Sequence, residues 1–135
     1  MILVDTNVLL DVATDDPVWA AWSLVQLDRA AARGPLVINS VIYAELSVGY
    51  ARIEELEAVL SLTGIALEDM PREALFLAGK VFQSYRQRGG GKTGVLPDFF
   101  IGAHAAVGGV SLLTRDPRRY RSYFPGLKLI CPNEE

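Results

Sequence analysis

The sequence predicts an α/β protein in which helices cover both faces of a mainly parallel sheet. Short apolar runs rich in β-branched residues alternate with longer segments whose apolar residues recur at helical spacing. The connections between the apolar runs can each hold one or two helices, which is what neighbouring parallel strands require. With 135 residues, half of them apolar, the chain can form one sizeable core but not two. We therefore expect a three-layer α/β/α sandwich made by residues 1–135 as a single domain.

The predicted strands are short runs of apolar residues bounded by polar ones. The first, Ile2-Leu3-Val4, is apolar at every position, as in a strand that is buried on both faces. The third is the least certain in pattern, because its apolar run is followed at once by acids. The expected strands are residues 2–4, 36–38, 65–67, 111–114 and 127–131.

The predicted helices begin at capping residues or prolines, and most of them end at glycines. Asp15-Asp16-Pro17 is typical of a helix start, since acids and proline are both favoured in the first turn. Residues 89–94 contain four glycines and are expected to form a loop. The expected helices are residues 6–13, 15–34, 39–49, 52–62, 71–88 and 97–107.

Composition excludes several classes of protein. The single cysteine, Cys131, rules out an internal disulfide and any zinc site made of several cysteines. No apolar run reaches the ~18 residues of a membrane span, and Asp5 interrupts the N-terminal apolar stretch. We expect a cytoplasmic protein with no membrane partner.

The formal net charge of −3 hides two halves of opposite sign. Residues 1–79 carry 12 acids and 4 bases, whereas residues 80–135 carry 4 acids and 9 bases. Such a basic half could bind a phosphate backbone, although a solvated basic surface is the commoner explanation of any single patch. The basic residues fall into two groups along the sequence: Arg86, Arg88 and Lys92, and then Arg115, Arg118, Arg119 and Arg121.

Four acids lie in segments that otherwise look like core. Asp5 ends the first strand, Glu45 lies within Val-Ile-Tyr-Ala-Glu-Leu, Asp98 precedes Phe-Phe-Ile, and Asp116 follows Leu-Leu-Thr-Arg. A buried unpaired carboxylate is costly, so each should have a partner or face a shared cleft. In an α/β sheet all four would lie at the carboxyl edge of the strands, where ligands bind. Each acid alone could be a helix cap or a turn residue.

Together the four carboxylates would repel one another without a counter-ion. Arginines could neutralise them structurally, or a hard divalent cation could do so functionally. Oxygen donors favour Mg²⁺ or Mn²⁺ over zinc. Such a metal activates water and stabilises a leaving oxygen in phosphoryl chemistry.

These motifs resemble those of the PIN-domain nucleases, and the size and order of the chain are similar to the VapC toxins within that family. The resemblance implies an endoribonuclease that depends on Mg²⁺ or Mn²⁺, usually a homodimer, held inactive by a cognate antitoxin. It assigns the site to Asp5, Glu45, Asp98 and Asp116, with Asp5, Asp98 and Asp116 as metal ligands. Asn7 and Thr114 match the family's supporting polar residues. The basic residues that would bind RNA are Arg86, Arg88, Lys92, Arg115, Arg118 and Arg119.

Two other readings remain open at this point. The acidic cluster could form a non-catalytic pocket that receives a partner's arginine. Alternatively, the chain could be a Mg²⁺-dependent phosphatase, although that chemistry requires a second aspartate at the position of Asn7.

Overall fold

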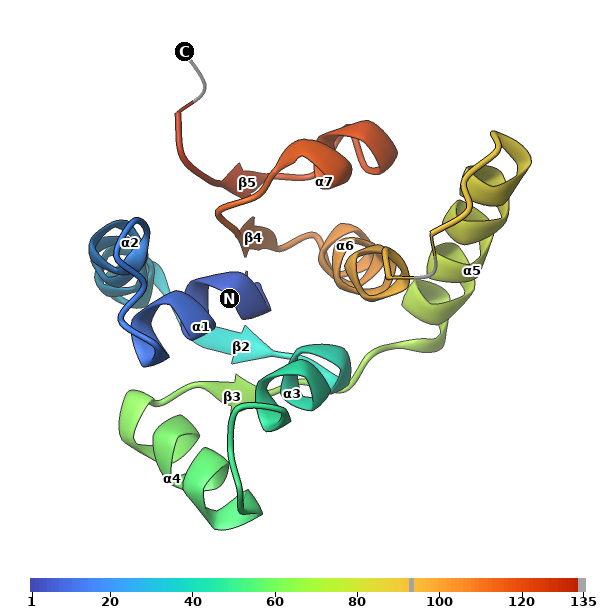
Figure 1. Cartoon of the computed structure of the whole chain (residues 1–135). Coiled ribbons are helices and arrows are strands. Elements are labelled where there is room, and N and C mark those ends of the chain that lie inside the picture. Colours follow the sequence, from blue (N-terminus) through green and yellow to red (C-terminus); the bar gives the residue numbers. More distant parts are fainter. Residues whose placement is uncertain (93, 134–135) are drawn as a thin grey trace.

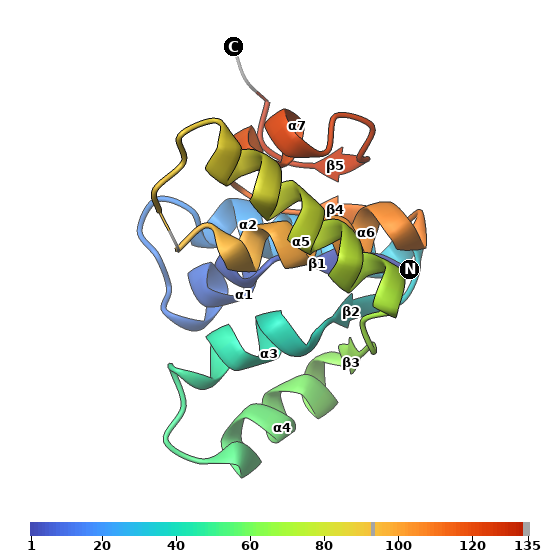
Figure 2. The same ribbon diagram turned by 90° about the vertical axis from the view of Figure 1, so that its right-hand side faces the viewer.

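The chain forms one five-stranded sheet in which every strand runs parallel to its neighbours. The computed structural model describes residues 1–92 and 94–133. The strand order is β3-β2-β1-β4-β5, so the first strand of the chain lies at the centre of the sheet. Figure 2 shows the five strands stacked in this order, and in Figure 1 β3, β2, β4 and β5 follow one another in the same sequence. They are β1 (Ile2–Val4), β2 (Leu36–Ile38), β3 (Ala66–Leu67), β4 (Ser111–Leu113) and β5 (Leu129–Ile130).

Helices cover both faces of this sheet, which confirms the predicted three-layer sandwich. One face carries α2, and the opposite face carries α6 with α5 outside it, as Figure 2 shows with α5 in front and α2 behind. α3 contacts both α1 and α6, and α7 packs against α6. The helices are α1 (Thr6–Ala13), α2 (Ala20–Arg33), α3 (Ser40–Ser47), α4 (Ile53–Thr63), α5 (Arg72–Gln87), α6 (Leu96–Gly108) and α7 (Arg118–Tyr123).

The core explains why the central strands are apolar at every position. Leu3 and Val4 of β1 and Leu112 of β4 are buried, because helices lie on both sides of the sheet. At one edge of the sheet, both residues of β3 are exposed. Phe99 of α6 is fully buried and contacts a cluster of aromatic rings between α5 and α7.

The structure departs from the predicted elements at two helices. α2 begins at Ala20 and not at residue 15, because Asp16 first organises a turn: its Oδ1 accepts hydrogen bonds from the N–H groups of Val18 and Trp19, at 2.9 and 2.8 Å. The helix α7 was not predicted, since its sequence Arg-Arg-Tyr-Arg-Ser-Tyr has no apolar stripe. Within the described part of the chain, no helix is long and apolar enough to cross a membrane.

The glycine-rich loop predicted at residues 89–94 follows α5 and packs on that helix. The N–H of Lys92 donates a hydrogen bond to the hydroxyl of Tyr85 at 3.1 Å. Gly90 lies so close to the Tyr85 ring that a Cβ there would meet ring carbons at 2.5 Å. The absence of a side chain at this position therefore allows the loop to approach the ring. Residue 93 of the predicted loop lies outside the described residues.

Candidate active site

The candidate site lies where the chain reverses its direction of travel across the sheet. From β1 the chain moves through β2 to β3 on one side, and later through β4 to β5 on the other. In parallel α/β sheets, this reversal leaves a crevice outside the carboxyl ends of the two strands that flank it. Asp5 follows β1 directly, and Thr114 follows β4 directly. The topology therefore brings residues more than 100 positions apart into contact.

All four acids singled out in the sequence line one open cleft at this crevice. Asp5, Glu45, Asp98 and Asp116 border a space of about 200 Å³. They come from the end of β1, from α3, from the first turn of α6 and from the loop after β4. The cleft is also lined by Thr6, Asn7, Leu10 and Tyr120.

Asp5 is the most deeply buried of the four, with 5% of its surface exposed. Its Oδ1 accepts a hydrogen bond from the N–H of Thr6 at 2.8 Å, which caps α1. Its Oδ2 accepts hydrogen bonds from the hydroxyls of Thr114 at 2.8 Å and Tyr120 at 2.9 Å. Burial raises the pKa of Asp5 to about 6; the hydroxyl of Thr114 opposes this rise, and the charge of Asp98 adds to it.

Glu45 is fixed by a second threonine. Its Oε1 accepts a hydrogen bond from the hydroxyl of Thr6 at 2.6 Å, and its side chain is half-buried. The helix α3 that carries Glu45 is capped by Asn39, whose Oδ1 accepts the N–H of Ile42 at 3.0 Å. The position of Glu45 is therefore fixed both by the hydrogen bond to its side chain and by the capped helix that carries it.

The predicted supporting residues, Asn7 and Thr114, form one hydrogen-bonded network with the loop after β4. The Asn7 Nδ2 lies 3.4 Å from the Asp5 Oδ2 and 3.3 Å from the Thr114 Oγ1. Its Oδ1 accepts the N–H of Arg115 at 3.3 Å. The Thr114 hydroxyl in turn accepts the N–H of Asp116 at 3.2 Å. This network sets the backbone that carries Asp116, whose side chain is 56% exposed.

Asp98 is held by two consecutive residues of α7. Nη1 of Arg119 donates to the Asp98 Oδ2. The Tyr120 hydroxyl lies 3.5 Å from the Asp98 Oδ1. Burial raises the pKa of Asp98, and the Arg119 guanidinium opposes the rise. Burial and the charges of Asp5 and Asp98 also raise the pKa of Tyr120 well above its ordinary value, so this hydroxyl stays protonated.

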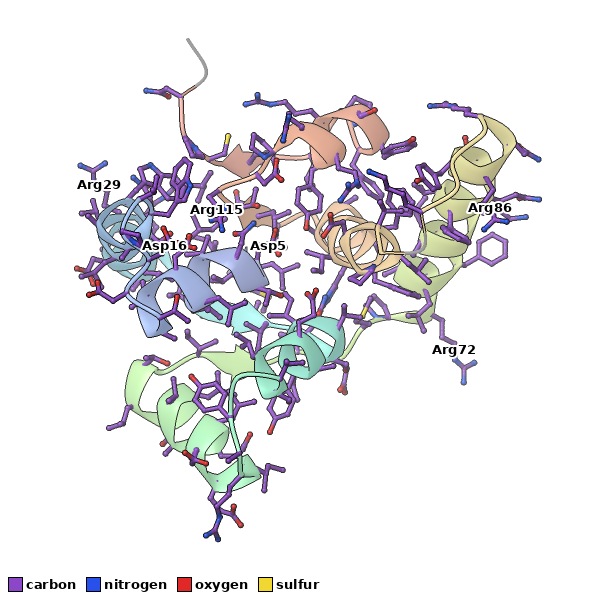
Figure 3. All side chains as sticks on the ribbon, viewed as in Figure 1. Asp5, Asp16, Arg29, Arg72, Arg86 and Arg115 are labelled. Carbon is purple, nitrogen blue, oxygen red and sulfur yellow. The ribbon has the colours of Figure 1, made fainter. Side chains whose placement is uncertain are left out.

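Arg115 does not face the cleft. Its Nε donates to the Asp11 Oδ2 at 2.8 Å, and Ser23 donates to the same oxygen at 3.0 Å. Its guanidinium also lies 5.6 Å from the centre of the Trp19 ring. In Figure 3, Arg115 points toward α2, whereas Arg86 projects from α5 on the other side of the molecule. The ion pair thus ties the loop after β4 to α1, and RNA binding by Arg115 stays a prediction.

The other predicted RNA-binding residues are on the surface or at its margin. Arg86 and Arg88 are exposed and lie over the rings of Phe82 and Tyr123, at 5.8 and 5.7 Å. Lys92 is exposed on the glycine-rich loop. Arg118 lies 3.6 Å from Asp116 in a solvent-exposed pair. Arg118 and Arg119 of α7 therefore lie beside acids of the cleft, and Arg88, directly after α5, reaches the ring of Tyr123 at the end of α7.

A family model described as the PIN domain matches residues 2–124 of this chain. The chain belongs to the PIN-domain family. A search of curated proteins gave no match.

Several solved structures share this fold. VapBC2 from Rickettsia felis, bound to a DNA fragment from its promoter, matches with a TM-score of 0.74 and 22% identity, over 98% of this chain and 100% of that chain. VapBC-1 from nontypeable Haemophilus influenzae matches with a TM-score of 0.71 and 19% identity, over 97% and 98%. DNA-bound VapBC from Salmonella typhimurium matches with a TM-score of 0.68 and 18% identity, over 96% of each chain. At these identities the likeness establishes the fold.

Sequence reasoning missed three residues that shape this PIN-domain site. Thr6 and Tyr120 touch the predicted acids directly, and Asp11 anchors the adjoining loop. Asp11 lies in Leu-Leu-Asp-Val, so the criterion that selected the other four acids would have found it. Tyr120 gave no such signal, because it stands among arginines in a segment that looks like a solvated surface.

The donor set of the cleft has the chemistry of a Mg²⁺ or Mn²⁺ site, but the carboxylates are not gathered around one point. Among residues 1–92 and 94–133, no group of three or more acidic, histidine or cysteine side chains could hold a metal ion as placed. Burial raises the pKa of Asp5, because the hydrogen bonds that its carboxylate accepts do not fully offset its desolvation. A cation would relieve that cost, provided that Asp98 gives up its contact with Arg119.

Proposed function

We propose that this PIN domain is a VapC-type toxin, an endoribonuclease that uses Mg²⁺ or Mn²⁺ to cleave RNA. The observation that carries the proposal is the cleft at the carboxyl edge of the sheet. It gathers four carboxylates from four separate elements, and one of them is buried at a cost in free energy. A purely structural role would not require four acids in one open cleft.

In this proposal Asp5, Asp98 and Asp116 hold the metal. The bound cation would supply a lowered pKa for an attacking water and compensation for charge on the phosphate. The chain itself orients Asp5: the hydroxyls of Thr114 and Tyr120 donate to its Oδ2, and the N–H of Thr6 donates to its Oδ1. Fixed ligand orientation of this kind is what surrounding hydrogen bonds contribute to metal sites.

Glu45 is the residue best placed to handle a proton. Thr6 fixes its Oε1 and so orients the carboxylate beside the cleft. A carboxylate in this position can accept a hydrogen bond from water and hold it near a bound phosphate. Arg118 and Arg119 of α7, with the exposed arginines of α5, would bind the RNA backbone, so that binding weakens steeply as salt concentration rises.

An antitoxin partner and a homodimer belong to the same proposal. A second hollow of about 480 Å³ lies between α1, α2 and α4 and is lined mainly by apolar side chains. Leu24 of α2 and Val59 of α4, both exposed, border it. A partner that covers this apolar surface would gain hydrophobic free energy. Leu24→Glu should therefore weaken copurification with the product of a neighbouring antitoxin gene.

The test of the nuclease is cleavage of RNA with Mg²⁺ or Mn²⁺, with and without EDTA. We expect Asp5→Asn and Asp98→Asn to abolish cleavage. The control is Asp69→Asn in the loop after β3, an exposed residue that borders neither hollow; it removes the same charge and should keep full activity. Full activity in the Asp5→Asn variant would refute the assignment.

A non-catalytic pocket that binds an arginine is the second candidate, because the cleft already accommodates the Arg119 guanidinium. The two proposals differ in metal binding. A nuclease should be stabilised against thermal unfolding by Mn²⁺, since a ligand that binds only the folded state raises the free energy of unfolding. An arginine-binding pocket with no metal chemistry should show no such effect.

A further inference from the structure

Arg119 forms an ion pair with Asp98, one of the four acids of the cleft. Its Nη1 donates to the Asp98 Oδ2, while the neighbouring Tyr120 hydroxyl approaches the other Asp98 oxygen at 3.5 Å. Both oxygens of this carboxylate thus face groups of α7. As long as Arg119 stays there, its positive charge opposes the binding of a cation by Asp98.

The exposure of this ion pair distinguishes it from the other pair near the site. The Arg115 and Asp11 side chains are 31% and 3% exposed, and Arg115 also packs over Trp19. Asp11 is buried although Arg115 is partly exposed, so the loss of Arg115 would leave a buried charge without its partner. The Arg119 and Asp98 side chains are 39% and 30% exposed at the border of an open cleft. Arg119 can therefore leave Asp98 and become hydrated.

The charges make two counter-ions of Asp98 mutually exclusive. A guanidinium and a divalent cation at the same carboxylate would repel each other strongly at the short distances involved. We propose that Arg119 is a built-in counter-ion that holds Asp98 until a divalent cation displaces it, so that arginine and metal compete for this carboxylate. The inference rests on the proposed function, because it needs a metal site that includes Asp98.

With such competition, the apparent metal affinity is the intrinsic affinity multiplied by the fraction of molecules in which Asp98 is not paired with Arg119. A half-exposed ion pair is modest in strength, so removing Arg119 should tighten metal binding by about twofold to fivefold. A residue that merely supports the site would have the opposite effect, since its loss would weaken binding. The sign of the change is therefore diagnostic.

The experiment is a calorimetric titration of the full chain with Mn²⁺, for the wild type and Arg119→Gln. Arg29→Gln is the control, because Arg29 is an exposed residue of α2 that points away from the molecule (Figure 3) and the change in charge is the same. We expect tighter binding in Arg119→Gln and no change in Arg29→Gln. Equal binding in the two variants, or weaker binding in Arg119→Gln, would overturn the competition.

A second variant covers the case in which Arg119→Gln does not fold. Arg119→Lys keeps the charge but lacks the planar fork that fits a carboxylate, so it should also bind Mn²⁺ more tightly than the wild type. Unchanged or weaker binding in Arg119→Lys would then overturn the inference. If neither the wild type nor any variant binds Mn²⁺, the proposed metal dependence itself fails. If the wild type binds Mn²⁺ as tightly as the Arg119 variants, only the role of Arg119 fails.

Discussion

Replacing Asp5 with asparagine removes a charge that the fold keeps away from water. Burial raises the pKa of Asp5 from 3.8 to about 6, so the native state binds this proton more tightly than the unfolded chain does. The free energy of unfolding should therefore fall as the pH rises from about 4 to about 6, and the loss should stay constant above that range. A shift of about 2 units, at about 1.4 kcal/mol per unit, corresponds to a cost of about 3 kcal/mol.

The asparagine would recover part of this cost. Its NH₂ group can donate to the hydroxyls of Thr114 and Tyr120, which now donate to the Asp5 Oδ2. The charge-assisted hydrogen bonds are lost, however, so the expected net gain is about 1–2 kcal/mol at pH 8. For a domain of this size, that gain corresponds to a rise in Tm of about 3–8 °C.

The assay is thermal unfolding in EDTA at pH 8 and at pH 4, followed by circular dichroism. Asp5→Asn should melt at a higher temperature than the wild type at pH 8, and the difference should nearly vanish at pH 4. Asp28→Asn, an exposed change of the same kind, should leave the Tm nearly unchanged at both pH values. A lower Tm for Asp5→Asn at pH 8 would refute the reasoning, because it would mean that the hydrogen bonds outweigh the desolvation of the charge.

Four further substitutions test other contacts. Tyr120→Phe removes the hydroxyl that orients the central aspartate, so Mn²⁺ affinity in a calorimetric titration should fall about tenfold or more while the fold is kept. Arg115→Gln leaves the buried Asp11 without its ion-pair partner and should lower the free energy of unfolding in urea by about 2–3 kcal/mol, less than for a fully buried pair because Arg115 is partly exposed. Gly102→Ala would push a Cβ into an aromatic ring of the core and should cost about 1–3 kcal/mol in the same urea assay, whereas Gly79→Ala, with open space around it, should stabilise its helix by up to about 1 kcal/mol.

The features that the sequence predicted correctly depend on short-range pattern and on the geometry of parallel sheets. A run such as Ile2-Leu3-Val4 can be satisfied only by a strand buried on both faces, and a carboxylate that follows it must lie at the carboxyl edge. The same argument places Asp116, whereas Glu45 and Asp98 were placed at this edge by their positions near the starts of helices. The structure shows that all four acids border one cleft. The strand order was not predictable, because the residues of one strand do not indicate which other strand it pairs with.

The features that were missed depend on contacts between distant residues. Tyr120 is buried because α7 packs on α6, and the local sequence of α7 gives no sign of that packing. Arg115 and Arg119 looked alike in the sequence, as two members of one basic group. In the structure one closes an enclosed ion pair and the other borders an open cleft, and only the three-dimensional arrangement of Asp11 and Asp98 separates them.

The two edge strands limit how this protein can associate with others. β3 and β5 have only two residues each, and Pro132, which lacks an N–H group, follows soon after β5. An edge this short offers too few free backbone groups to pair with a strand from another chain, so the sheet resists extension and the aggregation that follows from it. A second copy or another protein is therefore expected to dock on the helical layers, where side chains and not backbone ladders decide which partner fits.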